Sequence, residues 1–201
     1  LKRNEIEQLD LARRAVALNQ KTYLDLCFEE GIQDILSQLI RTAFVASPGH
    51  SLVMSDFSSI EARITAWLAG EKWRMDIFNS HGKIYEASAS KMFKVPIEEV
   101  TKGSVYRAKG KIAELALGFG GGVNSLKNMG GEAMGLTEGE MTQIVKGWRR
   151  ESPCIVRYWG EVEEKALHAV EYPGKTFSVG NVSFQLQNRI LWMKLPSGRY
   201  I

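Results

Sequence analysis

The stretch LVMSDFSSIEARITAWLAGE (residues 52–71) constrains the fold most, because it joins an apolar run to an amphipathic helix through one aspartate and two serines. The run SLVMSD is too short for an independent helix, so it predicts a short buried strand that ends at Asp56. Ser58, followed three residues later by Glu61, is a capping-box signature and predicts that a helix starts there. The stretch therefore predicts a strand, a turn and a helix, with a carboxylate at the tip of the strand.

Helical periodicity dominates the rest of the chain. In the helix that follows Asp56, the spacing puts Ile60, Ile64, Trp67 and Leu68 on an inner face, and Gly70 should end it. Further helices are predicted over 5–18, 31–43, 82–93 and 104–118, from the capping box of Thr137 and Glu140 to about Arg150, and from Pro153 to about Val170. KTFSVGNVSFQLQ predicts a hairpin around Gly180, and RILWMKLPSGRYI a strand, a turn and a further strand. The fold class expected is a helix-rich α+β arrangement.

Composition narrows the class of protein. The chain has 201 residues, 44% of them hydrophobic, which is enough for one large domain or two small ones. No run approaches 18 apolar residues, and the first residues carry no hydrophobic signal region, so we expect no membrane span and no export. Cys27 and Cys154 lie far apart, which favours reduced, buried thiols in a cytosolic protein over a disulfide framework. Net charge is +3, yet 102–111 holds four cations and no acid, and no aspartate follows Asp76.

Asp56 is a candidate metal ligand. A carboxylate at the end of a strand and beside a helix N-terminus is rigidly aimed, which suits a hard cation such as Mg²⁺. The local pattern also fits a simpler interpretation, in which Asp56 starts a turn and Glu61 closes the capping box. The residues of this segment leave both interpretations open.

A second candidate site lies in YRAKGKIAELALGFGGG. Arg107, Lys111, Leu115 and Phe119 recur every four residues and form one stripe on a helix. The stripe begins with two cations and ends with an aromatic ring beside glycines, which matches the polyphosphate and the base of a nucleoside triphosphate. An amphipathic helix with a solvated basic start would give the same pattern.

Other common sites are excluded. The sequence GKT at 174–176 has alanine where a Walker loop needs its first glycine, and it follows a helix instead of a strand. The three histidines are scattered, no Cys/His cluster has zinc spacing, and no G-x-S-x-G elbow is present. Arg149 and Arg150 are interpreted as a solvated helix end.

Together, in this order, the two segments resemble the family A DNA polymerases, in their phage-type branch. SDFSSIEAR resembles motif A of that family (D-Y-S-x-I-E-x-R), and RAKGKIAELALGFG resembles motif B (R-x3-K-x7-Y-G). Flanking segments such as IRTAF, GKIYEASASKMF, WRRESPCIVRYW and LPSGR extend the resemblance over essentially the whole chain.

The resemblance implies roles for the residues of motif A. Asp56 would bind both catalytic Mg²⁺ ions, and the carbonyl of Phe57 would be a further ligand. One ion would lower the pKa of the primer 3′-hydroxyl and the other would hold the triphosphate. Glu61 would act as the steric gate that disfavours ribonucleotides.

The resemblance implies nucleotide contacts elsewhere. Arg107 and Lys111 would bind the triphosphate, with Lys111 protonating the leaving pyrophosphate. Arg41 matches an arginine near the phosphates, and Phe119 and Gly120 would lie by the templating base pair.

Three positions depart from the family pattern. Leu115 stands where the family usually has Phe or Tyr, and Phe119 replaces the usual tyrosine and lacks its hydroxyl. Tyr85 stands where many members have a phosphate-contacting histidine, with His81 nearby. Sugar selectivity and nucleotide affinity are therefore left open.

The second catalytic aspartate of the family is absent, since no aspartate follows Asp76. The resemblance thus implies a fragment that is inactive alone, with the thumb and the remaining palm in a longer parent acting on primer-template DNA and dNTPs in a bacterial or phage-infected cell. We expect partial palm over 1–70, a helical fingers subdomain over 71–175 that carries the nucleotide-binding helix 104–118, and over 176–201 a hairpin that begins a return to an antiparallel palm sheet. An exposed apolar face would favour self-association. The alternative is a noncatalytic module that binds nucleic acid or nucleotides.

Overall fold

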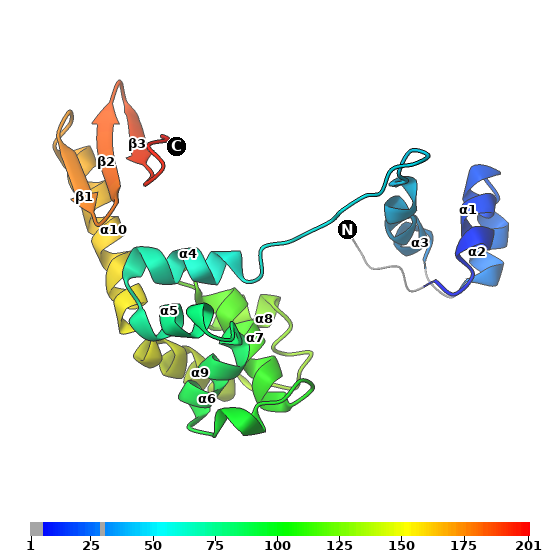
Figure 1. The fold of residues 1–201 in the computed structure, drawn as a ribbon, viewed down its shortest axis with the longest axis horizontal. Helices are drawn as coiled ribbons and strands as arrows, with labels where there is room; N and C mark the ends of the chain where they lie inside the picture. Colours follow the sequence, from blue (N-terminus) through cyan, green and yellow to red (C-terminus); the bar gives the residue numbers. More distant parts are fainter. Residues whose placement is uncertain (1–5, 29–30) are drawn as a thin grey trace. The chain divides into compact units, whose positions relative to one another are not determined.

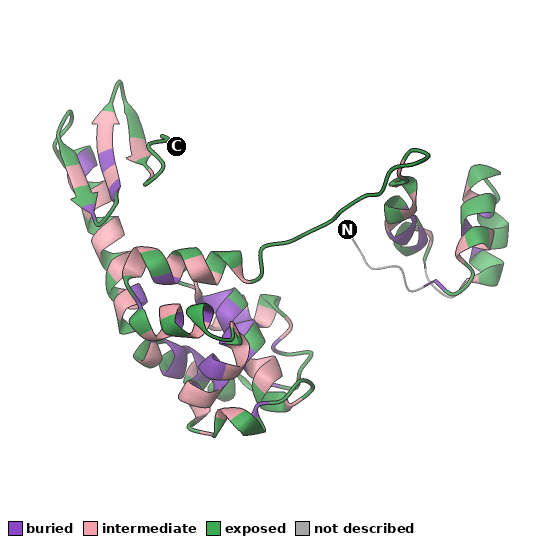
Figure 2. Ribbon diagram, viewed as in Figure 1, coloured by how far each residue is buried: buried purple, intermediate pink, exposed green. Residues whose placement is uncertain are grey.

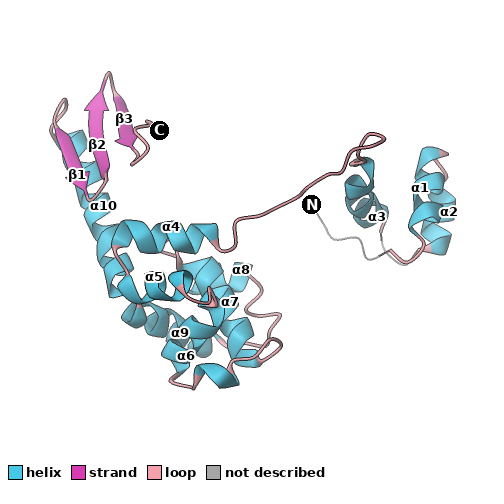
Figure 3. Ribbon diagram, in the orientation of Figure 1, coloured by secondary structure: helices cyan, strands magenta, loops and turns pink. Residues whose placement is uncertain are grey.

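The computed structural model describes residues 6–28 and 31–201. The chain divides into two compact units, Leu1–Asp56 and Phe57–Ile201. Helices predominate, and the one sheet is small and antiparallel (Figures 1 and 3). The helix-rich α+β class predicted from the sequence is therefore confirmed.

The described residues of the first unit form three short helices and a 3₁₀ turn. They are α1 (Leu9–Ala17), α2 (Lys21–Cys27), α3 (Ile32–Leu39) and η1 (Ile40–Ala43). A small core of Ala12, Ala15, Leu24, Ile35 and Leu39 holds them together. The predicted helices over 5–18 and 31–43 are present within narrower bounds, although residue 5 lies outside the described residues, and α2 was not predicted.

The prediction of a strand that ends at Asp56 is wrong. Residues 51–57 have no regular secondary structure, and Val53 and Met54 are 91% and 89% exposed. A strand needs a neighbour that accepts and donates its backbone hydrogen bonds. Within the described part of the chain the only ladders join β1, β2 and β3 to one another, so this segment has no such neighbour.

The second unit is built around a helical core. Its helices are α4 (Ile60–Ala69), α5 (Lys72–Asn79), α6 (Ile84–Phe93), η2 (Ile97–Glu99), α7 (Val105–Leu117), α8 (Val123–Asn128), α9 (Glu138–Glu151) and α10 (Pro153–Glu171). Leu117, Leu126, Met141 and Trp148 are almost fully buried where α7, α8 and α9 meet, and Ile155 of α10 joins them (Figure 2). This core fixes the face that α7 turns to solvent.

A three-stranded sheet packs on the far part of α10. The strands β1 (Thr176–Val179), β2 (Val182–Gln187) and β3 (Ile190–Lys194) follow one another in an antiparallel meander, as the turn around Gly180 predicted. Tyr200 adds a single bridge to Lys194 after the PSG turn. Val179, Val182 and Phe184 pack with Ala169 of α10, while the first half of that helix lies on the helical core (Figure 1).

Two expectations for α4 are wrong. Ser59, in the left-handed conformation (φ 52°), is the N-cap and makes no side-chain cap bond, so Glu61 falls at the second helical position, out of reach of a capping box. The predicted inner face is also largely exposed, with Ile60, Ile64 and Trp67 at 39%, 48% and 50%. Of the predicted inner face only Leu68 packs against a core cluster of the described residues, and the helix also packs through its small residues, of which Ala66 is fully buried.

Other local signals are confirmed. The Thr137 hydroxyl accepts from the Glu140 N–H at 3.2 Å, and the Glu140 carboxylate accepts from the Thr137 N–H at 2.9 Å, which completes a capping box. The bond from the Thr137 backbone holds the pKa of Glu140 below its usual value. Gly70 ends α4 at φ 69°, and Pro153 begins α10.

Candidate nucleotide-binding face

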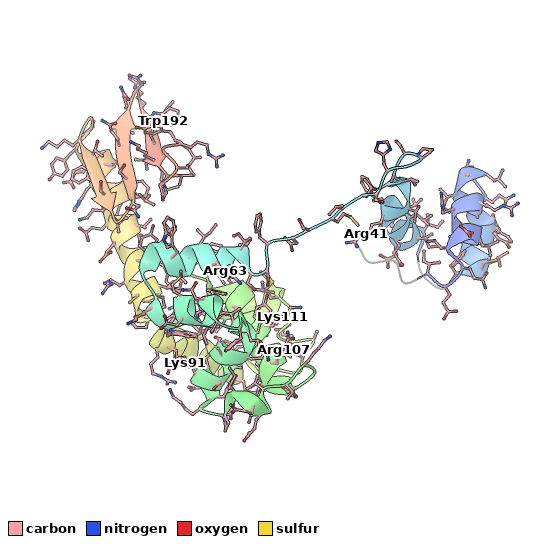
Figure 4. All side chains as sticks on the ribbon, viewed as in Figure 1. Arg41, Arg63, Lys91, Arg107, Lys111 and Trp192 are labelled. Carbon is pink, nitrogen blue, oxygen red and sulfur yellow. The ribbon has the colours of Figure 1, made fainter. Side chains whose placement is uncertain are left out.

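Helix α7 carries Arg107, Lys111 and Leu115 of the basic-to-aromatic stripe on its outer side, and Phe119 lies in the turn after the helix ends at Leu117. The Ser104 hydroxyl accepts from the backbone N–H of Arg107 at 3.2 Å and caps the helix N-terminus. Lys111, Leu115 and Phe119 are exposed, the last two at 40% and 69%, whereas the other side of α7 is buried in the core. Three of the four residues of the stripe therefore face solvent, whereas the Arg107 side chain is half-buried (Figure 4 labels the two cations of the stripe).

Gly110 brings α6 and α7 close together. A Cβ atom at this position would lie 2.9 Å from the Cβ of Ala89 and would clash with the Tyr85 carbonyl oxygen. Because only glycine leaves room for this approach, the first turn of α6 lies against the first turns of α7.

The close crossing gives Arg107 two partners on α6. The Arg107 Nε donates to the Glu86 carboxylate at 2.6 Å, and the guanidinium carbon lies 5.7 Å from the centre of the Tyr85 ring. The structure thus brings together two predicted site residues, Tyr85 and Arg107, and adds Glu86, which sequence reasoning missed. The sequence feature that could have pointed to Glu86 is the position of this acidic residue directly after Tyr85, near the start of a predicted helix.

A cavity of about 500 Å³ adjoins this cluster. Its charged and polar lining comes mainly from the start of α6 and from the segment before α7, and comprises His81, Lys83, Glu86, Glu98, Thr101 and Lys102. The His81 Nδ1 accepts from the Lys83 backbone N–H at 3.0 Å, so a neutral His81 ring carries its proton on Nε2. The cavity therefore offers hydrogen-bond donors and positive charge within reach of a polyanion, together with two carboxylates.

A buried ion pair fixes how α7 is rotated. The Glu114 carboxylate accepts from Arg74 Nη1 at 2.6 Å and from Trp148 Nε1 at 2.8 Å, and Arg74 Nη2 donates to the Ser152 hydroxyl at 2.8 Å. Glu114 follows Lys111 by three residues, so it lies about 60° around the helix and about 4.5 Å further along it. Bonds to α5 and α9 at this point hold Lys111 toward solvent. The sequence gives no local signal for this network, because its members come from separate helices.

The glycine-rich segment after α7 is also held in place. Gly120 adopts φ 81°, which favours glycine, and the Gly121 carbonyl accepts from Arg149 Nη2 at 3.2 Å. Arg149 was interpreted as a solvated helix end; it is exposed and also bonds this segment, which follows Phe119 directly.

The motif A residues of the second unit surround the start of α4. Phe57 is 79% exposed, its carbonyl accepts from the Ile60 N–H at 3.3 Å, and Glu61 is exposed. Arg63 Nε donates to the Ser58 carbonyl at 2.9 Å, so a side chain of the helix holds the turn that precedes it.

Arg41 and Asp56 belong to the first unit, and both are exposed. The Asp56 carboxylate makes no hydrogen bond to any described residue, and its hard oxygens suit Mg²⁺. Across residues 6–28 and 31–201, no three His, Cys, Asp or Glu side chains gather as a metal centre would require. Asp56 is thus a suitable ligand for Mg²⁺, but it supplies one carboxylate where a metal centre needs several ligands. The described helices also include none with the length and apolar character needed to cross a bilayer.

Comparison with known proteins decides the family. Residues 31–176 match the model of DNA polymerase family A. The chain belongs to this family. The resemblance predicted from SDFSSIEAR and RAKGKIAELALGFG is confirmed.

Individual relatives agree with this assignment. The DNA polymerase of Bacillus phage SP02 is 49% identical over 199 residues, which is 99% of this chain and 31% of the phage protein. The DNA polymerase I of Pseudomonas aeruginosa is 42% identical over 62 residues, 31% of this chain and 7% of that protein. The DNA polymerase of Mycobacterium phage D29 is 25% identical over 127 residues, 63% of this chain and 20% of that protein. This family A polymerase chain therefore spans less than a third of the length of these relatives.

Proposed function

We propose that this chain supplies motif A and the nucleotide-binding helix of a DNA polymerase that transfers nucleotides from dNTPs to a primer 3′-hydroxyl on template DNA. The observation that carries the proposal is the exposure of Lys111 and Leu115 on α7 and of Phe119 just after it, beside the half-buried Arg107, in a chain that belongs to family A.

Each residue of the stripe has a distinct task. Arg107 and Lys111 bind the triphosphate, and Lys111 donates a proton to the pyrophosphate as it leaves. Phe119 stacks on the nascent base pair, and the adjacent Gly120 leaves room for it. Leu115 lies between the phosphate-binding and base-binding parts, where it contacts the sugar.

Residues outside α7 complete the assignment. Asp56 and the Phe57 carbonyl would hold Mg²⁺, and a two-metal centre would supply charge neutralisation for the triphosphate and a lowered pKa for the primer hydroxyl. Glu61 excludes the ribose 2′-hydroxyl, and Tyr85 and Arg41 contact phosphates. The parent polymerase works in the cytoplasm of a bacterial or phage-infected cell, and the 201-residue chain is inactive alone because its last aspartate is Asp76.

Nucleotide binding tests the proposal directly. The dissociation constant of a dNTP is measured for the chain, for Lys111→Ala and for Asp56→Ala, each with and without Mg²⁺. We expect Lys111→Ala to weaken binding about 10-fold or more, since a charge-assisted bond to phosphate is worth about 1.5–3 kcal/mol. Asp56→Ala should remove the increase in dNTP affinity that Mg²⁺ produces.

The matched control is Lys146→Ala, which removes an exposed cation from α9. Equal effects of Lys111→Ala and Lys146→Ala would contradict a phosphate site on α7. Primer extension is expected from the parent and not from the 201-residue chain, and synthesis by the chain alone would overturn its proposed inactivity. Salt-sensitive DNA binding with no effect of Mg²⁺ on nucleotides would favour a noncatalytic module.

A further inference from the structure

Arg107 uses only one side of its guanidinium to bind Glu86. The bond runs from Nε to the Glu86 carboxylate at 2.6 Å. In the described part of the chain neither terminal nitrogen of Arg107 has a hydrogen-bond partner. The two terminal nitrogens form the fork that matches two oxygens of a phosphate.

We infer that Glu86 is a positioning residue, which holds Arg107 so that its terminal nitrogens point at the phosphates of the nucleotide. This inference rests on the proposed function, because it requires Arg107 to bind a polyphosphate. It adds a residue of α6 that neither sequence motif contains.

The surroundings make Glu86 a rigid support. Its side chain is 15% exposed and that of Arg107 is 27% exposed, so the pair is largely shielded from solvent. The Arg107 backbone is fixed by Ser104, and α6 cannot move away without losing its close packing on Gly110. The Tyr85 ring limits the guanidinium on another side.

Such a support improves binding by ordering the arginine in advance. A long side chain that becomes fixed only when ligand binds lowers affinity by a factor of about 2 to 10. Glu86 also has an opposite effect, because its negative charge repels phosphate. The two effects can be separated, since glutamine keeps the acceptor for Arg107 Nε while alanine lacks it, and both remove the charge.

The experiment compares dNTP dissociation constants for Glu86→Gln and Glu86→Ala in the presence of Mg²⁺. We expect the alanine variant to bind about 2- to 10-fold more weakly than the glutamine variant. The difference should vanish in an Arg107→Ala background and for a nucleoside without phosphates, which a general loss of structure would not produce.

Equal affinities of the two Glu86 variants, or tighter binding by the alanine variant, would overturn the inference while the α7 site stands. Arg107→Ala with unchanged affinity would instead show that the proposed phosphate role is wrong. Arg107→Lys, which keeps the charge and has no Nε, gives an independent reading. The Arg107→Lys variant should bind dNTP more weakly than the unaltered chain, and adding Glu86→Ala should not weaken dNTP binding further. A further loss of affinity in this double variant would also overturn the inference.

Discussion

Replacing Glu114 with alanine should destabilise the second unit by about 3–5 kcal/mol, the cost of breaking a buried ion pair. The Arg74 and Glu114 side chains are 1% and 2% exposed, so the arginine that remains cannot regain water. Trp148 Nε1 also loses its acceptor at 2.8 Å. For a unit of this size each kcal/mol lowers Tm by roughly 3–4 °C, so we expect Tm to fall by roughly 10–20 °C.

Calorimetry of single and double variants tests the reasoning. Arg74→Met should destabilise the unit by a similar amount, but Arg74→Met with Glu114→Leu should recover much of the loss, because no lone charge stays buried. The control is Glu161→Ala, which breaks an exposed pair with Arg157 and should change stability by less than about 1 kcal/mol. If Glu114→Ala matched this control, or if the double variant lost the sum of both singles, the buried pair would not organise the core as argued.

Three further outcomes are expected. Gly110→Ala should destabilise the unit by about 1–3 kcal/mol in urea titration, because its Cβ would collide with α6; an unchanged midpoint would mean that the helices separate freely. The hydrogen bond from Lys94 lowers the pKa of Glu151 in the folded state. The stability that the ionised Glu151 contributes is therefore present above the unfolded pKa of about 4.3 and is lost as pH falls through the folded pKa. The decrease in Tm between neutral pH and about pH 3 should therefore be smaller for Glu151→Gln than for the unaltered chain. An equal decrease in the two proteins would contradict this. Ile64→Lys should reduce self-association in sedimentation experiments if the exposed face of α4 drives it, and an unchanged distribution would assign association to another surface.

Most signals confined to a few neighbouring residues predicted the structure well, although the capping box expected from Ser58 and Glu61 is absent. The capping box at Thr137, the start of α10 at Pro153 and the end of α4 at Gly70 depend on backbone groups within one turn, and all three are present. The placement of Arg107, Lys111 and Leu115 on one side of α7 follows from helix geometry alone. The physical causes are local, so the sequence contains them.

Features that depend on distant partners could not be predicted in this way. A strand before Asp56 needed a neighbouring strand, and the apolar residues of α4 needed a covering surface; periodicity reports neither. Glu86 and Glu114 were missed because their partners come from other helices, 21 and 40 residues away in the chain.

Helix α10 joins the α7–α9 core to the three-stranded sheet without a proline after its first residue. Its 19 residues make a rod of about 28 Å. A tilt of about 10° at the end that rests on α9 would sweep the other end through roughly 5 Å. The helix is therefore a rigid connection, and a tilt of α10 on the α7–α9 core would move the three strands of the sheet as one piece.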